Sequence, residues 1–338
     1  MNLKELISRI KVDRIMGNPE VNIEGLTYDS RKVKRGYLFV AIRGFKKDGH
    51  QFIPEAIKRG AKAVVVEKEM DKQFPIPKIT VIKVASSRLA LSRLSAHWYG
   101  FPSQKLRVIG ITGTNGKTTI AYLLESIFKT SGLKVGKLST IDYDLGSGVY
   151  PSSITTPESQ DLQRMLRIMV DQGLECIVME VSSHSLILYR TEGVEFDQAV
   201  FTNFSPEHLD FHHNLRNYLE AKTSLFRGLG RGAKKKTTKA AIINIDDPAA
   251  DYIISNTSVK VVTYGIKKNP AVQGKILTTG LNGTSFLVKT KEAKGGKINL
   301  ALLGIHNVYN SLAAISVALE EKIDFPIIKK GLEKINKV

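Results

Sequence analysis

The chain has 338 residues, more than one ordinary domain needs, so about two domains are expected. Hydrophobic residues make up 42% and charged residues 24% of it, as in soluble globular proteins, which excludes disordered and fibrous classes. The single cysteine, Cys176, cannot form an internal disulfide, which fits a reducing compartment, and its apolar neighbours predict that it is buried.

Positive charge is in excess, with 50 Lys and Arg against 32 Asp and Glu and a net charge of +18. Such an excess favours a polyanionic partner, namely nucleic acid, membrane lipid or a small molecule. The cations are spread along the chain, and their densest run, residues 234–236 with Lys239, is expected to be a solvated loop. No aromatic-rich basic repeat accompanies it, so no nucleic-acid partner is expected.

Membrane targeting is not indicated by the sequence. Residues 1–13 alternate charged and apolar side chains at helical spacing, unlike a signal peptide. No apolar stretch approaches the roughly 18 residues that span a bilayer. We therefore expect a cytoplasmic protein with no membrane partner.

Residues 1–102 are expected to form a small α/β domain. Short apolar, β-branched runs predict strands, and Gly60 marks the end of a helix. A loop is expected around Pro75 and Pro77, and residues 100–103 mark a domain boundary. The expected elements are strands at 37–42, 63–66 and 81–84, and helices at 52–59 and from a Ser86 or Ser87 cap to Trp98.

Residues 103–338 are expected to form a second α/β domain. Its strands alternate with helices, which predicts a mostly parallel sheet with helices on both faces. A hairpin with a polar loop at 291–296 is also expected. The expected elements are strands at 108–112, 176–181, 199–202 and 240–245, helices at 117–130 and 308–320, and hairpin strands at 284–290 and 297–303.

A glycine-rich turn joins the first strand of this domain to its first helix. It contains Gly113, Thr114, Asn115, Gly116, Lys117, Thr118 and Thr119. Glycines let the backbone N–H groups face phosphate oxygens, Lys117 can bridge the terminal phosphates, and Thr118 can ligate magnesium. The generic pattern is not strictly met, because Ile111 stands where its first glycine belongs. The turn still predicts a nucleoside triphosphate site, rather than a turn with an incidental lysine.

Two further side chains follow strands of the predicted sheet. Glu180 ends an apolar strand at the edge where such folds bind ligands, and a carboxylate there suits magnesium. His208 lies beyond another strand and could reach the same cleft. Phosphoryl transfer brings anions together, and metal ions and a lysine neutralise their charge.

Several motifs in one order resemble the Mur ligase family, ATP-dependent amide-bond ligases of peptidoglycan precursor synthesis. Tyr28–Arg31 and Gly44–His50 are similar to the N-terminal domain of the members that add the third amino acid. GTPases and kinases are disfavoured because their base-reading and catalytic-loop motifs are missing. The other motifs are Thr112–Thr118, Thr155–Pro157, Glu180–His184, Asn203–Asp210, Tyr218–Lys222 and Gly304–Asn310.

The resemblance assigns roles at the phosphate loop. It implies ATP and Mg²⁺ as cofactors, with Lys117, Glu180, His208 and Lys222 as catalytic residues. Thr118 and Glu180 would hold one magnesium ion, and His208 with Glu180 a second. Lys222 would be carbamylated by carbon dioxide, which turns it into an anion that binds or organises the metal. Without the resemblance, an exposed helix lysine would be the expectation for Lys222.

The remaining histidines and asparagines have competing interpretations. His184, His212 and His213 lack a standard zinc spacing. We expect His184 to be structural or near the substrate, and His212 and His213 to lie on the surface. The resemblance places His306 and Asn307 near the adenine, whereas helix capping is the alternative for Asn307 and Asn310.

The resemblance also implies a nucleotide-sugar substrate. Its uridine diphosphate end would contact Ser30, Arg31, Asp48, Gly49 and His50, although a surface loop is the stronger expectation for 48–50. Its muramoyl-dipeptide end would contact Thr155, Thr156, Ser182 and Arg190, polar groups suited to hydroxyls and carboxylates.

The expected activity is activation of the D-Glu carboxylate of UDP-MurNAc-L-Ala-D-Glu as an acyl phosphate, for attack by a diamino acid, meso-diaminopimelate or L-lysine. The alternatives are another Mur-type ligase, acting on folate or a different muramoyl peptide, and a non-catalytic nucleotide-binding module. Family members usually continue with a third domain beyond residue 338. We therefore expect a monomeric N-terminal fragment that binds substrate but ligates poorly or not at all.

Overall fold

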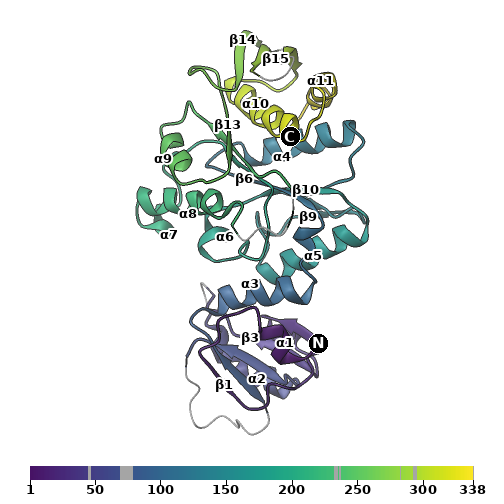
Figure 1. Cartoon of the computed structure of the whole chain (residues 1–338), viewed down its shortest axis with the longest axis vertical. Helices are drawn as coiled ribbons and strands as arrows, with labels where there is room; N and C mark the ends of the chain where they lie inside the picture. Colours follow the sequence, from purple (N-terminus) through teal and green to yellow (C-terminus); the bar gives the residue numbers. More distant parts are fainter. Residues whose placement is uncertain are drawn as a thin grey trace. The chain divides into compact units, whose positions relative to one another are not determined.

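The computed structural model describes residues 1–44, 47–68, 79–231, 235, 237–281, 283–291 and 295–337. The expected loop at Pro75 and Pro77, Lys234 and Lys236 of the basic run, Phe45 and Lys46, and residues 292–294 of the hairpin loop lie outside these residues. The chain forms two compact units (Figure 1). The N-terminal unit comprises Met1–Pro102, Pro157–Arg167 and Leu188–Val194, and the central unit comprises Ser103–Thr156, Ile168–Ile187 and Glu195–Val338.

A five-stranded sheet organises the N-terminal unit, in the order β1-β5-β4-β3-β2. Neighbouring strands from β2 to β5 are parallel, and β1 is antiparallel to β5. Alternate side chains face opposite sides, so Leu38 packs with Leu91 of α3 while Phe39 packs with Ile53 of α2. The elements are β1 Arg14–Met16, β2 Gly25–Thr27, β3 Tyr37–Val40, β4 Ala63–Val66, β5 Thr80–Lys83, α1 Leu3–Ile7, α2 Ile53–Lys58 and α3 Ser87–Trp98.

Local sequence signals set the limits of these elements. The side chain of Ser86 caps α3 by accepting a hydrogen bond from the Leu89 N–H. Ser86 is one of the two residues that the sequence predicted as the cap. Strand β4 has the predicted bounds, whereas β3 ends two residues before the predicted limit of 42. The predicted α/β character of this unit is confirmed.

The described part of the central unit contains an eleven-stranded sheet in the order β16-β15-β14-β13-β12-β11-β6-β10-β7-β8-β9. Strands β7, β10, β6, β11, β12, β13 and β14 run parallel, and the two ends of the sheet are antiparallel. The strands are β6 Arg107–Thr112, β7 Val135–Leu138, β8 Asp142–Asp144, β9 Val149–Pro151, β10 Cys176–Glu180, β11 Gln198–Phe201, β12 Ala240–Asn244, β13 Lys260–Gly265, β14 Val272–Gly280, β15 Gly283–Thr290 and β16 Gly296–Leu300.

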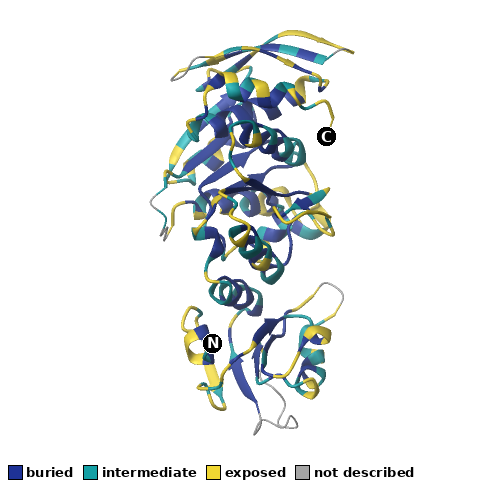
Figure 2. Ribbon diagram, turned by 90° about the vertical axis from the view of Figure 1, so that its right-hand side faces the viewer, coloured by how far each residue is buried: buried dark blue, intermediate teal, exposed yellow. Residues whose placement is uncertain are grey.

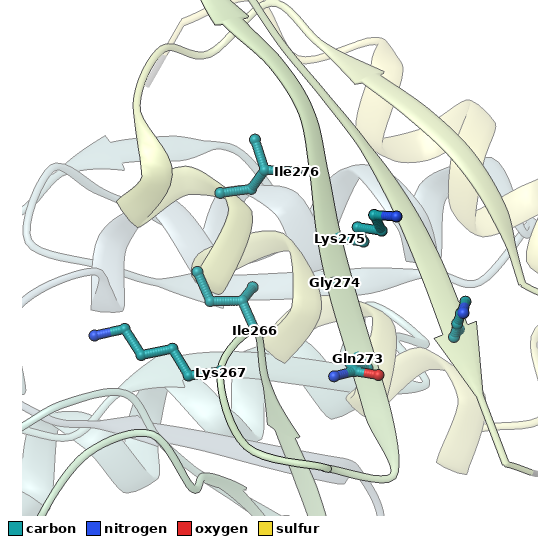
Figure 3. Close-up of a pocket in the computed structure, with 7 residues that line it drawn as sticks. Ile266, Lys267, Gln273, Gly274, Lys275 and Ile276 are labelled. Carbon is teal, nitrogen blue, oxygen red and sulfur yellow. The ribbon is translucent and has the colours of Figure 1, made fainter.

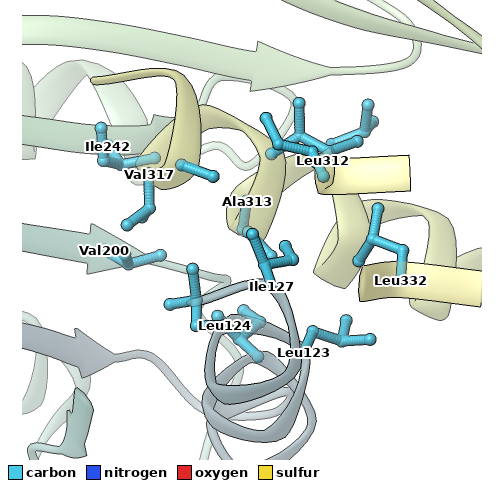
Figure 4. Packing of buried hydrophobic residues seen from close by; sticks show 14 of the residues in the cluster. Leu123, Leu124, Ile127, Val200, Ile242, Leu312, Ala313, Val317 and Leu332 are labelled. Carbon is cyan, nitrogen blue, oxygen red and sulfur yellow. The ribbon is translucent and has the colours of Figure 1, made fainter. Parts of the chain in front are cut away.

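Helices cover both faces of the central sheet, as predicted. Val200 of β11 belongs to the core formed with α4, α10 and α11 (Figure 4), whereas the next residue, Phe201, meets Phe226 of α8 on the other side. Figure 2 shows the central strands of this sheet as buried, whereas strands at its ends carry exposed residues. The helices of this unit are α4 Lys117–Thr130, α6 Ser183–Ile187, α7 Leu209–His212, α8 Leu215–Gly228, α9 Ala250–Ser255, α10 Ile305–Glu320 and α11 Phe325–Glu333. Helix α5, Ser159–Asp171, belongs to the N-terminal unit as far as Arg167 and to the central unit from Ile168.

The predicted solvated basic loop is wrong for the two lysines that the structure describes. The side chains of Lys235 and Lys239 are each only 8% exposed and pair with Asp197, which is 1% exposed. The Asp197 carboxylate also accepts a hydrogen bond from the Val108 N–H. A buried carboxylate at the start of β11 needs counter-ions, so the lysines fold inward.

Cys176 is buried, as predicted, and burial raises the pKa of its thiol to about 12. Among the residues that the structure describes, no helix is both long and apolar enough to cross a membrane.

Candidate active site

The turn between β6 and α4 is shaped so that two positions admit only glycine. Gly113 has φ +144°, and a Cβ there would lie 1.9 Å from the Thr202 hydroxyl oxygen. Gly116 has φ +89°, and a Cβ there would lie 2.3 Å from the side-chain oxygen of Asn310 in α10. The segments that contain Thr202 and Asn310 therefore pack directly against the backbone of this turn. The turn forms a cradle at the N-terminus of a 14-residue helix.

Two lysine amines converge on this turn. Lys117 Nζ donates to the carbonyl oxygens of Gly113 at 3.0 Å and Thr114 at 2.8 Å. Lys222 Nζ, from α8, donates to the same Gly113 oxygen at 2.8 Å and lies 4.2 Å from the centre of the Tyr218 ring. Lys222 is 2% exposed, so the expectation of an exposed helix lysine is wrong.

Burial lowers the pKa of both lysines, and repulsion by Lys117 lowers that of Lys222 further. Desolvation, followed by the charge of Lys117, lowers the pKa of Lys222 to about 7, against a partial opposing effect of Glu207. Desolvation also lowers the pKa of Lys117, opposed by Glu180 and Glu207. Lys222 therefore has a large neutral fraction near neutral pH, when its amine is a nucleophile.

Glu180 lies at the carboxyl end of β10 and is 1% exposed. Its Oε1 accepts hydrogen bonds from the Thr118 hydroxyl and the Thr140 N–H, both at 2.8 Å, and its Oε2 accepts one from the Thr140 hydroxyl at 3.1 Å. Carboxylate and hydroxyl oxygens beside a phosphate cradle fit Mg²⁺, which keeps waters and substrate phosphates as its other ligands. Among the described residues, no group of three or more His, Cys, Asp and Glu side chains could hold a metal ion.

His208 lies next to Tyr218, which contacts the turn. His208 has a left-handed backbone conformation at the start of α7, and its ring lies 6.3 Å from that of Tyr218. The Tyr218 hydroxyl lies 3.3 Å from the Thr114 hydroxyl and 3.4 Å from Glu207 Oε2. The contacts thus link His208 and Lys222 through Tyr218, and Lys222 and Lys117 through Gly113.

The prediction that His212 lies on the surface is wrong. This residue is 3% exposed, and its Nε2 lies 2.9 Å from the Ser183 hydroxyl. His213 is exposed, as predicted. His184 stacks on Phe211, with 4.2 Å between ring centres, which fits its expected structural role. The spacing of the histidines in the sequence did not predict that His212 is buried, because its burial depends on helices that follow different strands.

The capping interpretation of Asn307 and Asn310 is wrong. Helix α10 begins after Gly304, so both residues lie inside its first two turns. Asn307 is buried, donates to the Leu303 carbonyl at 2.8 Å and accepts from the Asn310 amide at 3.0 Å. His306 is exposed beside it, with its Nε2 3.2 Å from the Asn307 amide nitrogen.

The residues expected at the uridine diphosphate end lie within the N-terminal unit. Ser30 donates to Glu55 at 3.0 Å, and Arg31 makes two hydrogen bonds of 2.9 Å to Asp29. Asp48 accepts from the His50 N–H and lies 2.6 Å from its Nδ1.

Residues 48–50, for which a surface loop is the alternative, are partly buried, and hydrogen bonds hold the segment. His50 Nε2 accepts the Glu67 N–H, and a Cβ on Gly49 would lie 2.5 Å from the Ile42 carbonyl oxygen. The imidazole therefore bridges the segment to the end of β4.

The residues expected at the muramoyl-dipeptide end divide between the units. Thr155, Thr156 and Ser182 belong to the central unit, where the Thr156 hydroxyl donates to the Glu180 carbonyl and lies 3.4 Å from the Ser182 hydroxyl. The Thr155 hydroxyl accepts from Thr140 at 3.2 Å. Arg190 belongs to the N-terminal unit, 3.4 Å from Glu158.

Sequence reasoning missed Thr140 and Glu207. Thr140 follows β7, a neighbour of β10, so its place at the carboxyl edge of the sheet was the available signal. It also missed a cavity of about 280 Å³ beside β13, β14 and β15 (Figure 3). That cavity contains none of the predicted site residues; it is lined by Ile266, Lys267, Gln273, Gly274, Lys275, Ile276 and Lys289.

A glycine-rich turn at the edge of a parallel sheet, with a buried carboxylate and two lysines, defines a P-loop nucleotide-binding protein. Residues 111–318 match the Mur ligase middle domain, and residues 22–99 match the Mur ligase family, catalytic domain. The chain therefore belongs to the Mur ligase family.

Two relatives that are similar in sequence carry the same name. The UDP-N-acetylmuramoyl-L-alanyl-D-glutamate--2,6-diaminopimelate ligase of Caldanaerobacter subterraneus subsp. tengcongensis is 44% identical over 318 residues, which are 94% of this chain and 63% of the relative. That of Clostridium tetani is 40% identical over 338 residues, 100% of this chain and 68% of the relative. The chain thus spans about two thirds of these relatives' length.

Solved structures agree in fold. The structure of a UDP-N-acetylmuramoyl-L-alanyl-D-glutamate--2,6-diaminopimelate ligase superposes with a TM-score of 0.82 at 27% identity, covering 99% of this chain and 66% of that one. A structure of MurF from Acinetobacter baumannii has a TM-score of 0.66 at 25% identity, covering 94% and 64%. The predicted fold class is confirmed.

Proposed function

We propose that this chain carries the nucleotide and carboxylate sites of an ATP-dependent ligase that joins 2,6-diaminopimelate to UDP-MurNAc-L-Ala-D-Glu. The names of the similar proteins support this substrate pair and favour diaminopimelate over lysine. The observation that carries the proposal is the convergence of Lys117 and Lys222 on the glycine turn, next to the buried carboxylate of Glu180.

The reaction would proceed in two steps. The D-Glu carboxylate attacks the γ-phosphorus of ATP, forming an acyl phosphate and releasing ADP. The amine of the diamino acid then attacks the acyl carbon, forming the amide and expelling inorganic phosphate. Lys117 would pair with the phosphates that the backbone of Gly113–Gly116 cradles.

Thr118 and Glu180 would hold one Mg²⁺, and Glu180, His208 and Lys222, as a carbamate, would hold or organise a second. These ions would neutralise charge on the transferred phosphoryl group. The buried amine of Lys222 supports the carbamate, because its pKa of about 7 supplies the neutral form that adds to carbon dioxide. Carbamylation also replaces a buried cation with an anion beside another cation.

The substrate contacts follow the same division into units. Ser30, Arg31 and residues 48–50 would bind the uridine diphosphate, Thr155, Thr156 and Ser182 the dipeptide near Glu180, and Arg190 a carboxylate. His306 and Asn307 would contact the adenine. Asn307 is buried, and hydrogen bonds with Leu303 and Asn310 fix its amide.

Hydroxylamine trapping tests the proposal on the chain itself. Acyl phosphates react with hydroxylamine to give hydroxamates, so the chain with ATP, Mg²⁺ and UDP-MurNAc-L-Ala-D-Glu is expected to form a UDP-MurNAc-dipeptide hydroxamate. Lys117→Met should abolish it, whereas Lys129→Met, on the exposed end of the same helix, should not.

Each alternative predicts a different result. A ligase of folate or another muramoyl peptide would form hydroxamate only with its own carboxylate substrate. A non-catalytic module would bind ATP, measured by calorimetry, and form no hydroxamate with any of them.

A further inference from the structure

His212 occupies the centre of an aromatic and imidazole cluster beside the site. Its ring lies 4.8 Å from that of Phe211, 4.9 Å from Tyr218 and 5.5 Å from His184. Its Nε2 lies 2.9 Å from the hydroxyl of Ser183. A buried imidazole with a hydrogen-bond partner is fixed in orientation more tightly than an apolar ring of equal size.

Three functional segments meet at this one side chain. Ser183 opens α6, three residues after Glu180. His212 itself ends α7, which begins after His208, and its backbone N–H donates to the His208 carbonyl at 3.0 Å.

The third segment is α8. Its Tyr218 packs against the His212 ring, and the Lys222 amine lies over the face of the Tyr218 ring. The carbonyl of His212 also accepts the side-chain amide of Asn217, at 3.1 Å. One residue thus contacts the three segments that present Glu180, His208 and Lys222.

We propose that His212 is a positioning residue for the acyl-phosphate reaction. It fixes the relative positions of the segments that carry Glu180, His208 and Lys222, and the hydrogen bond with Ser183 fixes the orientation of its own ring. This inference rests on the proposed function and extends it, because none of the roles assigned above includes His212. It also explains why a histidine, rather than a phenylalanine, is packed here.

Three variants separate the hydrogen bond from the packing. His212→Gln keeps a polar atom at the distance of Nε2, His212→Phe keeps the ring without the hydrogen bond, and Ser183→Ala removes the partner hydroxyl. We expect His212→Phe to lower the kcat of hydroxamate formation roughly tenfold to a hundredfold, because small misplacements of reacting groups cost this much. The KM for ATP should stay within about twofold, since Lys117 and the glycine turn are untouched.

The conservative variant and the partner variant complete the test. His212→Gln should recover most of the kcat, and Ser183→Ala should add little further loss in the His212→Phe background. His97→Phe is the matched control: His97, in the N-terminal unit, also has a ring nitrogen 3.1 Å from a carbonyl oxygen and stacks on a phenylalanine. It should leave the kcat unchanged.

Histidine NMR gives a readout that does not need the reaction. His212→Phe should shift the ring resonances of His208 and His184, and His212→Gln should restore them. If the native chain forms no hydroxamate, the proposed function fails, and these resonances alone decide the positioning role. A folded His212→Phe protein with unchanged His208 resonances, or with the native kcat, would overturn the inference, as would equal losses in the Phe and Gln variants.

Discussion

Lys117 and Lys222, 105 positions apart in the sequence, donate to one backbone oxygen, the carbonyl of Gly113, at 3.0 and 2.8 Å. Two ammonium groups on a single acceptor repel each other, and Lys222 is buried while Lys117 is half-buried. The arrangement therefore favours a neutral amine on one of them, and the pKa of about 7 places that neutral form on Lys222.

Lys222 should react with carbon dioxide at neutral pH, whereas ordinary lysines stay protonated. With ¹³C-bicarbonate, one carbamate signal is expected in the NMR spectrum, growing as the pH rises through about 7, where the amine loses its proton. Lys117→Met removes the repelling charge, so the same signal should require a higher pH. Lys222→Met should lack the signal; its persistence in that variant would assign the carbamate to another lysine.

Lys222 should also make folding depend on pH in a defined direction. Its ordinary pKa is 10.5 and its folded pKa is about 7, so between these values the unfolded chain binds more protons. Stability should therefore rise with pH from about 7 to about 10 and should be lowest below 7. In carbon dioxide-free buffer, Lys222→Met should be more stable than the native chain at pH 7, by a few kcal/mol at most.

Urea titrations at pH 7 and pH 10 measure the free energy of unfolding of the native chain and of Lys222→Met. The difference between the two proteins should shrink at the higher pH. Lys268→Met, which removes an exposed lysine of the same unit, serves as control and should show no such pH-dependent gain. Parallel pH profiles for the native chain and Lys222→Met would contradict the buried-cation interpretation.

Gly116→Ala should destroy nucleotide binding through a steric clash rather than backbone strain. Its Cβ would lie 2.3 Å from Asn310 Oδ1, so α10 must move away from the turn. Gly132 has the same φ of +89° with no heavy atom within 4 Å of its Cβ position, so Gly132→Ala isolates the backbone cost of about 1–2 kcal/mol. Calorimetric titration with ATP should show binding to Gly132→Ala and none to Gly116→Ala.

Asp197→Ala should strongly destabilise the central unit. It would leave Lys235 and Lys239 as buried cations without their carboxylate, which costs about 3–5 kcal/mol when a buried pair is broken. Burial alone would raise the pKa of Asp197, but the charge and hydrogen bonds of the two lysines lower it overall. The carboxylate's contribution should thus remain at pH 4 and be lost only in stronger acid.

Glu20→Gln, which breaks the exposed Lys4–Glu20 pair, is the control and should leave the urea midpoint unchanged. If the urea midpoint of Asp197→Ala equals that of the native chain, Lys235 and Lys239 must bind water or other partners in that variant.

Elements whose signals are local were predicted well. Helix α4 has the bounds 117–130, because a glycine turn precedes it and its apolar side chains recur at helical spacing. The hairpin of β15 and β16 is also confirmed, with the second strand ending at Leu300 rather than 303. Strand β14, which pairs with both β13 and β15, was missed because its polar outer half lacks an apolar pattern.

The phosphate turn and the order of the motifs were determined by the sequence itself, since consecutive backbone groups and a fixed spacing to Lys117 and Thr118 suffice to define them. Burial was decided only by the tertiary structure. His212, Lys222 and Lys235 look like surface residues in their own segments, and each is enclosed by side chains from distant strands and helices. Desolvation by those neighbours is a sum over the whole unit, so no local pattern carries it.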